Sequence, residues 1–276
     1  MAINDVSLTS GMRHNLLQLQ GTRKLIDRTQ ERLSTGKKVN SALDNPTNFF
    51  AAQSHVNRAA DFSARKDGMG EAVQNIKAAD AGITAITAMI DAAKGLAEAA
   101  LGTSNTTSRA AYGSQFDSLM TKIDDLATDS TYRGTNLLKS EDLLVNFNEN
   151  GTSNLTVNAF NAAHNSTDLA INTTAATDWN TTDNAAITGT QDELRLATDT
   201  LRDKSKGLSN NLTIITTRQN FTDSMISTLQ GGADNLTLAD MNQEGANMLM
   251  LQTRQSLGTT ALSLSSQAAQ SVLRLF

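Results

Sequence analysis

The stretch that organises the chain runs from Met69 to Ala100 and reads MGEAVQNIKAADAGITAITAMIDAAKGLAEAA. Every seventh residue from Met69 onward is apolar, and a second apolar column follows three positions further along. An a/d heptad pattern of this length, with no proline inside it, buries one seam of a helix against other helices. The two columns are Met69, Ile76, Ile83, Ile90 and Ala97, and Ala72, Ala79, Ile86, Ala93 and Ala100. The sequence therefore predicts a long helix inside a helical bundle.

Compatible apolar stripes lie near both ends of the chain. They predict helices over residues 4–33, 190–229 and 234–276, beside a helix over 46–101 and a shorter one over 109–128. Helices from opposite ends can pair only if the chain runs out and returns. We therefore expect a mainly α fold, a long antiparallel coiled coil or bundle. The stripe residues are Met12, Leu19, Ile26 and Leu33, then Leu194, Leu201, Leu208 and Ile215, then Met248, Leu251, Leu262, Val272 and Phe276.

Helix boundaries are predicted from local signals. Gly36 is expected to end the first helix in a left-handed cap, and Asn45-Pro46 to begin the next one. A capping box at Thr190–Glu193 predicts the start of the following helix. Gly231-Gly232 is expected to break that helix, and Asp234 to cap the last one.

The middle of the chain has a different texture. Residues 143–147 and 155–160 read as two strands around an Asn/Gly-rich turn, which predicts a small β-hairpin. About half of residues 161–190 are Asn, Thr and Ser, with scattered Ala. We expect that segment to bury little and to form an exposed, irregular insertion.

Composition excludes several classes of function. There is no cysteine, the net charge is −5, and no run of Lys and Arg exceeds two residues, so neither a thiolate site nor nucleic-acid binding is expected. No apolar run approaches the roughly 20 residues of a membrane span, and the N-terminal stretch lacks the apolar core of a cleavable signal. We expect no membrane insertion.

No group of residues indicates catalysis. His14, His55 and His164 have no spacing that suggests a metal site, and we expect isolated surface or interface histidines. Asp117 and Asp124-Asp125 are expected on the solvated face of a short helix. The sequence predicts no enzyme activity, no cofactor and no metal.

Three segments resemble one known family, the bacterial flagellins. Residues 33–48, LSTGKKVNSALDNPTN, resemble the connector of these proteins, and residues 132–138, YRGTNLL, resemble the entry into their β-hairpin. The ending, ANMLMLQTRQSLGTTALSLSSQAAQSVLRLF, is similar to their C-terminal helix. The resemblance covers residues 1–140 and 190–276, and leaves out the middle.

The resemblance implies a structural subunit that polymerises head-to-tail into the flagellar filament for swimming motility. Residues 1–45 and 234–276 would form the coiled coil of an inner tube, and residues 46–140 and 190–233 the helical bundle of an outer tube. Residues 141–189 would be the hairpin and a surface-exposed variable region. The terminal helices, whose seams are narrow, would order on assembly.

The same resemblance implies partners and a location. The subunit would be exported through the flagellar type III secretion apparatus, held before export by a chaperone, and added under a cap protein next to hook-junction proteins. It would then be secreted and lie in the extracellular filament. The alternative is a hook–filament junction protein or another exported coiled-coil adaptor, which would form only finite assemblies.

Two further surface features follow from the resemblance. Exposed Ser and Thr of flagellins are often O-glycosylated, which makes Thr173, Thr174, Thr181 and Thr182 candidates. Many flagellins also carry an epitope read by an innate immune receptor. Leu96 matches that epitope, whereas Ala92 and Gly95 stand where its pattern has an Arg and a Glu, so we expect weak or absent receptor activation.

Overall fold

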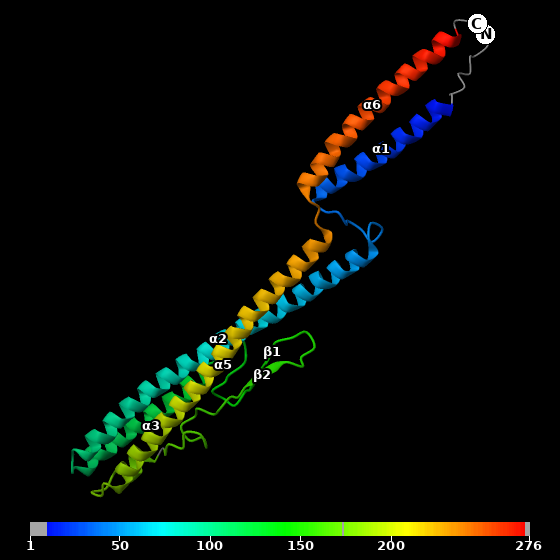
Figure 1. Cartoon of the computed structure of the whole chain (residues 1–276). Coiled ribbons are helices and arrows are strands. Elements are labelled where there is room, and N and C mark those ends of the chain that lie inside the picture. Colours follow the sequence, from blue (N-terminus) through cyan, green and yellow to red (C-terminus); the bar gives the residue numbers. More distant parts are fainter. Residues whose placement is uncertain (1–9, 173, 274–276) are drawn as a thin grey trace, which may run out of the picture. The chain divides into compact units, whose positions relative to one another are not determined.

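The computed structural model describes residues 10–172 and 174–273, and it is dominated by helices (Figure 1). The prediction of a mainly α fold with a small hairpin is confirmed. In chain order the elements are α1 (Ser10–Thr35), α2 (Pro46–Leu101), α3 (Thr106–Asp129), β1 (Leu143–Asn146), β2 (Asn154–Val157), α4 (Ala175–Asp178), α5 (Ala185–Thr237) and α6 (Met241–Leu273).

The chain divides into two compact units. The terminal unit runs up to Arg58 and resumes at Thr228, and the central unit spans Ala59–Ser227. Helices α2 and α5 contribute residues to both units. Each unit has its own packing and is described by itself.

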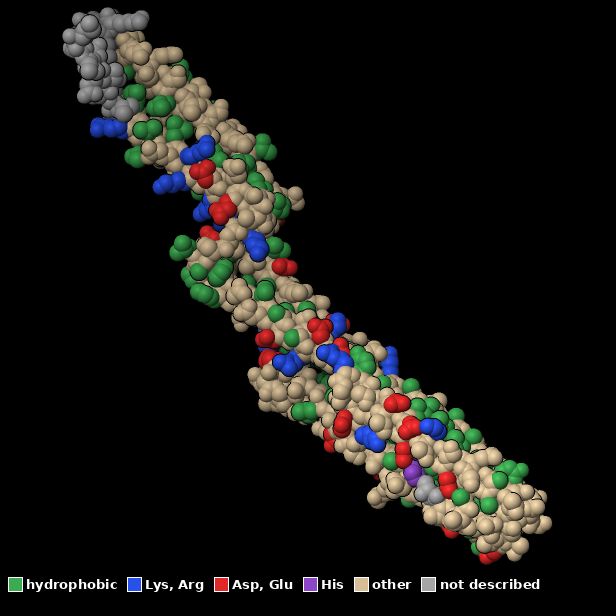
Figure 2. Space-filling view, turned by 180° about the vertical axis from the view of Figure 1, so that it is seen from behind, with side chains coloured by type: hydrophobic (Ala, Val, Ile, Leu, Met, Phe, Trp, Pro, Cys, Tyr) green, Lys and Arg blue, Asp and Glu red, His purple; other side chains and the backbone are tan. Residues whose placement is uncertain are grey.

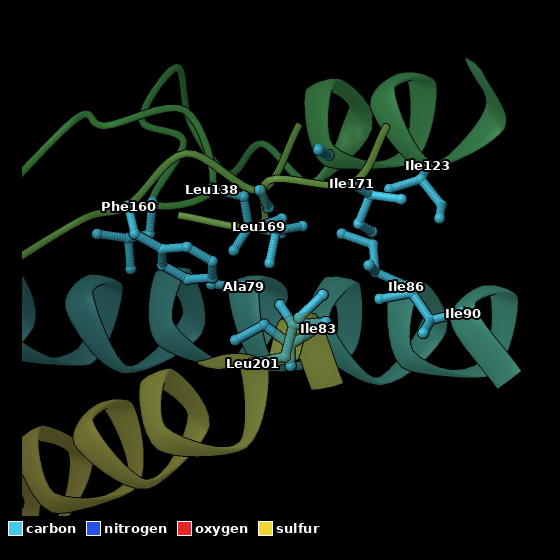
Figure 3. Close-up of a cluster of buried hydrophobic side chains, with 14 of the residues drawn as sticks. Ala79, Ile83, Ile86, Ile90, Ile123, Leu138, Phe160, Leu169, Ile171 and Leu201 are labelled. Carbon is cyan, nitrogen blue, oxygen red and sulfur yellow. The ribbon is translucent and has the colours of Figure 1, made fainter. Parts of the chain in front are cut away.

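The central unit is built on the Met69–Ala100 columns. Met69, Ile76, Ile83 and Ile90 are buried in one cluster that also contains the apolar stripe of α5. In Figure 3, Ile83 of α2 lies against Leu201 of α5. The small Ala residues of the second column allow the neighbouring segments to approach α2 closely. The members of the cluster from α5 are Leu194, Ala197, Leu201, Leu208 and Ile215.

Residues 161–184 form a packed layer over this core, so the prediction that they bury little is wrong. Leu169 and Ile171 are buried, and Figure 3 shows Ile171 between Ile123 of α3 and Ile86 of α2. Trp179 is fully buried, and its ring centroid lies 5.1 Å from that of Phe116. The average composition of the segment is polar, but its few apolar residues are placed to face the helices.

A glycine on α3 makes room for this layer. A Cβ on Gly113 would collide with the backbone of Ala175, coming within 2.6 Å of its carbonyl carbon. No side chain can occupy that position without moving the backbone of the docked segment. The close approach therefore depends on Gly113 as much as on the apolar contacts around it.

The predicted hairpin is confirmed. Strands β1 and β2 pair antiparallel, with Leu143 opposite Val157 and Val145 opposite Leu155. Gly151 has a φ of +67°, which places it in the left-handed region that a tight turn requires and that suits glycine.

In the terminal unit, α1 and α6 lie side by side as a helical pair (Figure 1). Met12, Ile26 and Leu251 are buried in their seam. A Cβ on Gly258 would lie 2.5 Å from the Leu19 side chain, so this glycine forms the hole that receives Leu19. Leu33, Met248 and Leu262 are half-buried. The Phe276 residue and the Val272 side chain lie outside the described part.

Two of the predicted boundaries are wrong. Helix α5 continues through Gly231-Gly232 to Thr237, because burial of Leu229 and Ala233 on either side offsets the low helix propensity of glycine. The cap of α6 is Asp240 and not Asp234: the Asp240 Oδ1 accepts from the backbone N–H groups of residues 242 and 243, at 2.9 and 3.1 Å.

The capping box at Thr190 is also absent, because α5 begins at Ala185. The Thr190 side chain is inside the helix, and its hydroxyl donates to the Ala186 carbonyl at 3.0 Å. The two signals around the first connector are confirmed. Gly36 has a φ of +70°, and the Asn48 backbone N–H donates to the Asn45 Oδ1 at 3.1 Å.

Candidate self-assembly surfaces

Helix α6 has two apolar faces. One face packs on α1 through Leu251 and the neighbouring seam positions. The opposite face carries Met250, Leu257 and Leu264 at a spacing of seven residues, and all three are mostly exposed, Leu257 at 67%. A second heptad column at this spacing has the pattern of another helix–helix seam. Nothing in the described part of the chain covers it.

Helix α1 adds apolar side chains of its own to the uncovered surface. Leu17 is 66% exposed, and Leu16 and Leu25 are partly exposed on the flanks. Figure 2 shows hydrophobic side chains distributed along the outer surface of α1 and α6. Exposed apolar side chains in such continuous rows mark sites of protein–protein contact more often than isolated ones do.

The seam between α1 and α6 is partly polar. Arg32 of α1 and Glu244 of α6 form an ion pair at 2.8 Å, in which the Glu244 side chain is only 10% exposed. Thr22 and Thr29 are also buried in the seam. The buried ion pair fixes the register of the two helices, but the polar content limits how much apolar area the pair buries.

The layer over residues 161–184 is held by polar contacts that sequence reasoning missed. The Asp124 carboxylate accepts from the His164 backbone N–H at 2.8 Å and lies 2.9 Å from the His164 Nδ1. His164 is therefore buried and partnered, and the prediction of an isolated histidine is wrong. Asp124 is likewise half-buried, so the predicted solvated face is wrong at this position, whereas Asp125 is exposed.

Asp117 holds the same segment one turn and a half further back on α3. Its Oδ2 accepts from the Ala176 backbone N–H at 3.1 Å, and its Oδ1 is buried without a hydrogen-bond partner among the described residues. Burial raises the pKa of the Asp117 carboxyl, and the nearby Asp178 charge adds to the effect. The predicted solvated position is wrong here too.

A buried arginine closes the far end of this layer. Arg109 is 3% exposed and donates to the carbonyls of Thr103 and Thr181 at 2.7 and 2.8 Å. It also donates to the Asp183 carbonyl at 3.2 Å and to the Asn184 Oδ1 at 2.6 Å. One guanidinium therefore ties the loop before α3 to the loop before α5, in the fork geometry that only arginine provides.

The remaining predicted surface residues lie where solvent reaches them. Ala92 and Gly95 are exposed on α2, whereas Leu96 is half-buried and packs on the central core. Thr174, Thr181 and Thr182 are exposed, although the Thr174 hydroxyl contacts Asn172 and Asp178. Thr173 lies outside the described residues.

Two searches over the described residues returned nothing. No three His, Cys, Asp or Glu side chains are grouped so that they could hold a metal ion in residues 10–172 and 174–273. In that same part of the chain, no helix combines the length and the apolar character needed to cross a membrane.

Comparisons with known proteins agree with this architecture. The family model described as the bacterial flagellin N-terminal helical region matches residues 3–142. Flagellin FljK of Caulobacter vibrioides is 34% identical over 284 residues, covering 100% of both chains. A flagellin of Brucella melitensis is 26% identical, covering 95% of each.

A crystal structure of Bacillus cereus flagellin is 18% identical in sequence and covers 56% of this chain and 88% of that one. Its TM-score of 0.47 is too low to support any inference about the fold. The family model and the full-length relatives are sufficient without it. The chain belongs to the bacterial flagellin family, whose members are structural subunits of the flagellar filament.

Proposed function

We propose that this filament subunit polymerises head-to-tail through the uncovered apolar face of α6. The observation that carries the proposal is the column of Met250, Leu257 and Leu264, which remains exposed after α1 has covered the opposite face. Burying each such side chain contributes roughly 1.5–3 kcal/mol. A heptad column of this kind is matched by a helix from another copy.

The seam residues have an indirect role in this proposal. Met12, Leu19, Ile26 and Leu33 hold α1 on α6 and so present the outer column in a fixed orientation. The contact joins one surface of a subunit to a different surface of the next, because such a heterologous contact does not close and generates an open helical polymer.

The domain roles follow the same division of labour. We assign residues 1–45 and 234–276 to the inner tube, residues 46–140 and 190–233 to the outer tube, and residues 141–189 to the outer surface. The dry core of the central unit supports the role of a part that folds alone, and the uncovered columns of the terminal helices support the role of a part that assembles.

We also propose the export route and the partners that such a subunit requires. The apolar face of α6 needs a cover before assembly, which an export chaperone would supply on the way to the type III secretion apparatus. Secretion would deliver the subunit to the extracellular filament, where it would meet the cap and hook-junction proteins.

The experiment is elongation of short filament seeds by purified subunit. The double variant Leu257→Ser with Leu264→Ser should raise the critical concentration about 100-fold, because each lost burial of 1.4 kcal/mol or more is a factor of ten. The matched control is Leu196→Ser, which removes an equally exposed leucine from the central unit and should elongate normally. Normal elongation by the double variant would reject the proposal.

The alternative of a junction or adaptor protein predicts a different result in the same assay. Wild-type subunit that stops at small assemblies of constant size, whatever the seed and concentration, would favour that alternative. Unlimited growth of filaments favours the subunit.

Two surface proposals need separate measurements. Ala92 and Gly95 leave the exposed face of α2 without the cation and anion of the receptor epitope, so a reporter-cell assay should give weak or absent activation; full potency would contradict this. Thr174, Thr181 and Thr182, with Thr173, remain candidates for O-glycosylation. An intact filament-protein mass equal to the sequence mass would dismiss them.

A further inference from the structure

The connector between α1 and α2 contains a tight turn with a fixed backbone. The Asp44 Oδ2 accepts from the backbone N–H groups of Ser41 and Asn40, each at 3.0 Å, and from the Ser41 hydroxyl at 3.3 Å. These backbone hydrogen bonds, from Ser41 and then from Asn40, hold the pKa of the Asp44 carboxyl below its usual range. The turn therefore keeps its shape at neutral pH.

The tip of this turn projects an apolar side chain into solvent. Leu43 is 95% exposed, although its backbone N–H is held by the Ser41 hydroxyl at 3.3 Å. Phe50, in the first turns of α2, is 61% exposed, and its ring meets that of Phe49 edge-on with centroids 5.5 Å apart. Hydrophobic side chains gather at this connector in Figure 2.

The projection is organised for docking. Its backbone is already fixed by hydrogen bonds, so little conformational entropy remains to be lost when the side chains are buried. Leucine and phenylalanine gain most of their burial energy on contact. We name Leu43 and Phe50 together the connector knob.

The same unit has a groove with matching properties. It has a volume of about 500 Å³ and lies where α1 and α6 meet. Leu25 provides an apolar wall, and Gly21 leaves open space, with no atom within 4 Å of an added Cβ. The full lining is Gln18, Gly21, Thr22, Lys24, Leu25, Arg28 and Arg254.

Three cations rim this groove, and none of them is neutralised. Lys24, Arg28 and Arg254 form no ion pair with any described carboxylate, whereas the adjacent Arg23 is paired with Asp27 at 3.3 Å. Cations that face a partly apolar hollow attract the negative face of an aromatic ring. An aromatic and an aliphatic side chain together suit this groove better than a charged segment does.

We propose that the connector knob of one subunit inserts into the α1–α6 groove of a second copy. The partner is a second copy because the projection and the hollow are complementary in shape and chemistry and belong to the same chain. They are different surfaces of one unit, so the contact propagates from copy to copy instead of closing a dimer. The inference rests on the proposed polymerisation and adds a second contact to it.

Cross-linking tests the contact directly, because the chain has no cysteine. Leu43→Cys subunit and Gly21→Cys subunit are mixed in equal amounts, polymerised on seeds and treated with a short bis-maleimide. The expected product is a covalent dimer that joins residue 43 of one copy to residue 21 of another. The matched control replaces the second variant with Gly189→Cys, which has equally open space but lies in the central unit, and should give no dimer.

A second measurement covers the case in which a cysteine disturbs assembly. Leu43→Ser with Phe50→Ser should raise the critical concentration for elongation about tenfold or more and leave the thermal melting of the monomer unchanged. The control is Leu144→Ser, another half-exposed leucine, in the hairpin.

The outcomes separate this inference from the proposed function. Wild-type subunit that does not elongate seeds contradicts the polymerisation itself. Wild-type elongation combined with unaltered elongation by the serine variant, or with a cross-link only inside one chain, overturns the knob-and-groove contact and leaves the polymerisation standing.

Discussion

The two units solve the same packing problem in opposite ways. In the central unit the heptad columns of α2 meet apolar residues on every side, and Met69, Ile86 and Ile90 are fully buried. In the terminal unit a seam with the same spacing covers only one side of α6, while Leu257 and its column face water. Periodicity predicts that a helix packs, but the opposite face decides whether one chain satisfies the packing or a second copy is needed.

The difference is visible in the polar groups as well. Polar side chains of the central unit hold backbone in place, as Asp124 and Arg109 do for the segment over residues 161–184. In the terminal seam, Arg32 and Glu244 occupy space that an apolar pair would use. The central unit is therefore expected to be stable alone, and the terminal helices to gain most of their stability on assembly.

The largest effect is expected in the centre of the α2 seam. Ile83→Asp should lower the free energy of unfolding by roughly 4 kcal/mol or more, because it places a charge in the dry contact with Leu201. Circular dichroism during urea unfolding measures this change. Ala88→Asp, on the exposed side of the same helix, should cost less than about 1 kcal/mol. Normal filament yield from the Ile83 variant would contradict the comparison.

The next largest effect concerns the layer on α3. Gly113→Ala should cost roughly 1–3 kcal/mol, since the new methyl group collides with the Ala175 backbone. The single tryptophan, Trp179, should shift its fluorescence to the red as the layer loosens. Gly189→Ala, in an open helical position, should stabilise the protein by up to about 1 kcal/mol. Equal effects of the two substitutions would show that residues 161–184 are not tightly docked.

A smaller, pH-dependent effect is expected at Asp117. Its pKa is raised in the folded state by burial, so the native protein binds this proton more readily than the unfolded chain does. The contribution of this group to stability therefore increases as the pH falls from neutral through the raised pKa towards the ordinary value of 3.8.

The variant Asp117→Asn isolates this contribution. It should be more stable than the wild type at pH 7, and its advantage should shrink as the pH is lowered. The urea midpoint, followed by Trp179 fluorescence at each pH, gives the difference between the two proteins, so other carboxylates cancel. Glu71, whose pKa is lowered by Arg133, acts in the opposite direction in both. An advantage that grows at low pH would contradict the assignment.

The smallest effect is expected in the terminal seam. Gly258→Ala gains helix propensity but displaces the flexible side chain of Leu19, whereas Gly245→Ala gains the propensity in open space. The two variants should differ by roughly 1 kcal/mol in the melting of the α1–α6 pair. Hydrogen exchange of α6 amides in the monomer measures it. Identical protection in both variants would mean that Leu19 does not fill the hole at Gly258.

The seams, the hairpin and the first connector could be predicted because their signals are local. Heptad spacing, the Asn148–Asn154 turn, Gly36 and Asn45-Pro46 need no knowledge of distant residues. The same spacing rule, applied to every register, would also have revealed the second column at Met250 and Leu257, which the first reading passed over.

The rest depended on tertiary placement. A helix end at Gly231-Gly232 follows from propensity alone, and the burial of Leu229 and Ala233 reverses it. The composition of residues 161–184 is an average that hides which positions face α3. Arg109 and Asp117 gained their roles only when distant loops came within hydrogen-bonding distance, and no spacing in the sequence records that.

The backbone bridge of the connector has a mechanical consequence. Lys38 N–H donates to the Thr237 carbonyl at 2.7 Å, and Ala239 N–H to the Gly36 carbonyl at 2.9 Å, so the outgoing and the returning chain are tied together at one level. Tension or torque applied to one of these two passes is shared by the other. Since the link consists of main-chain atoms, evolution can change the side chains on both passes without weakening it, and proline is the main exception.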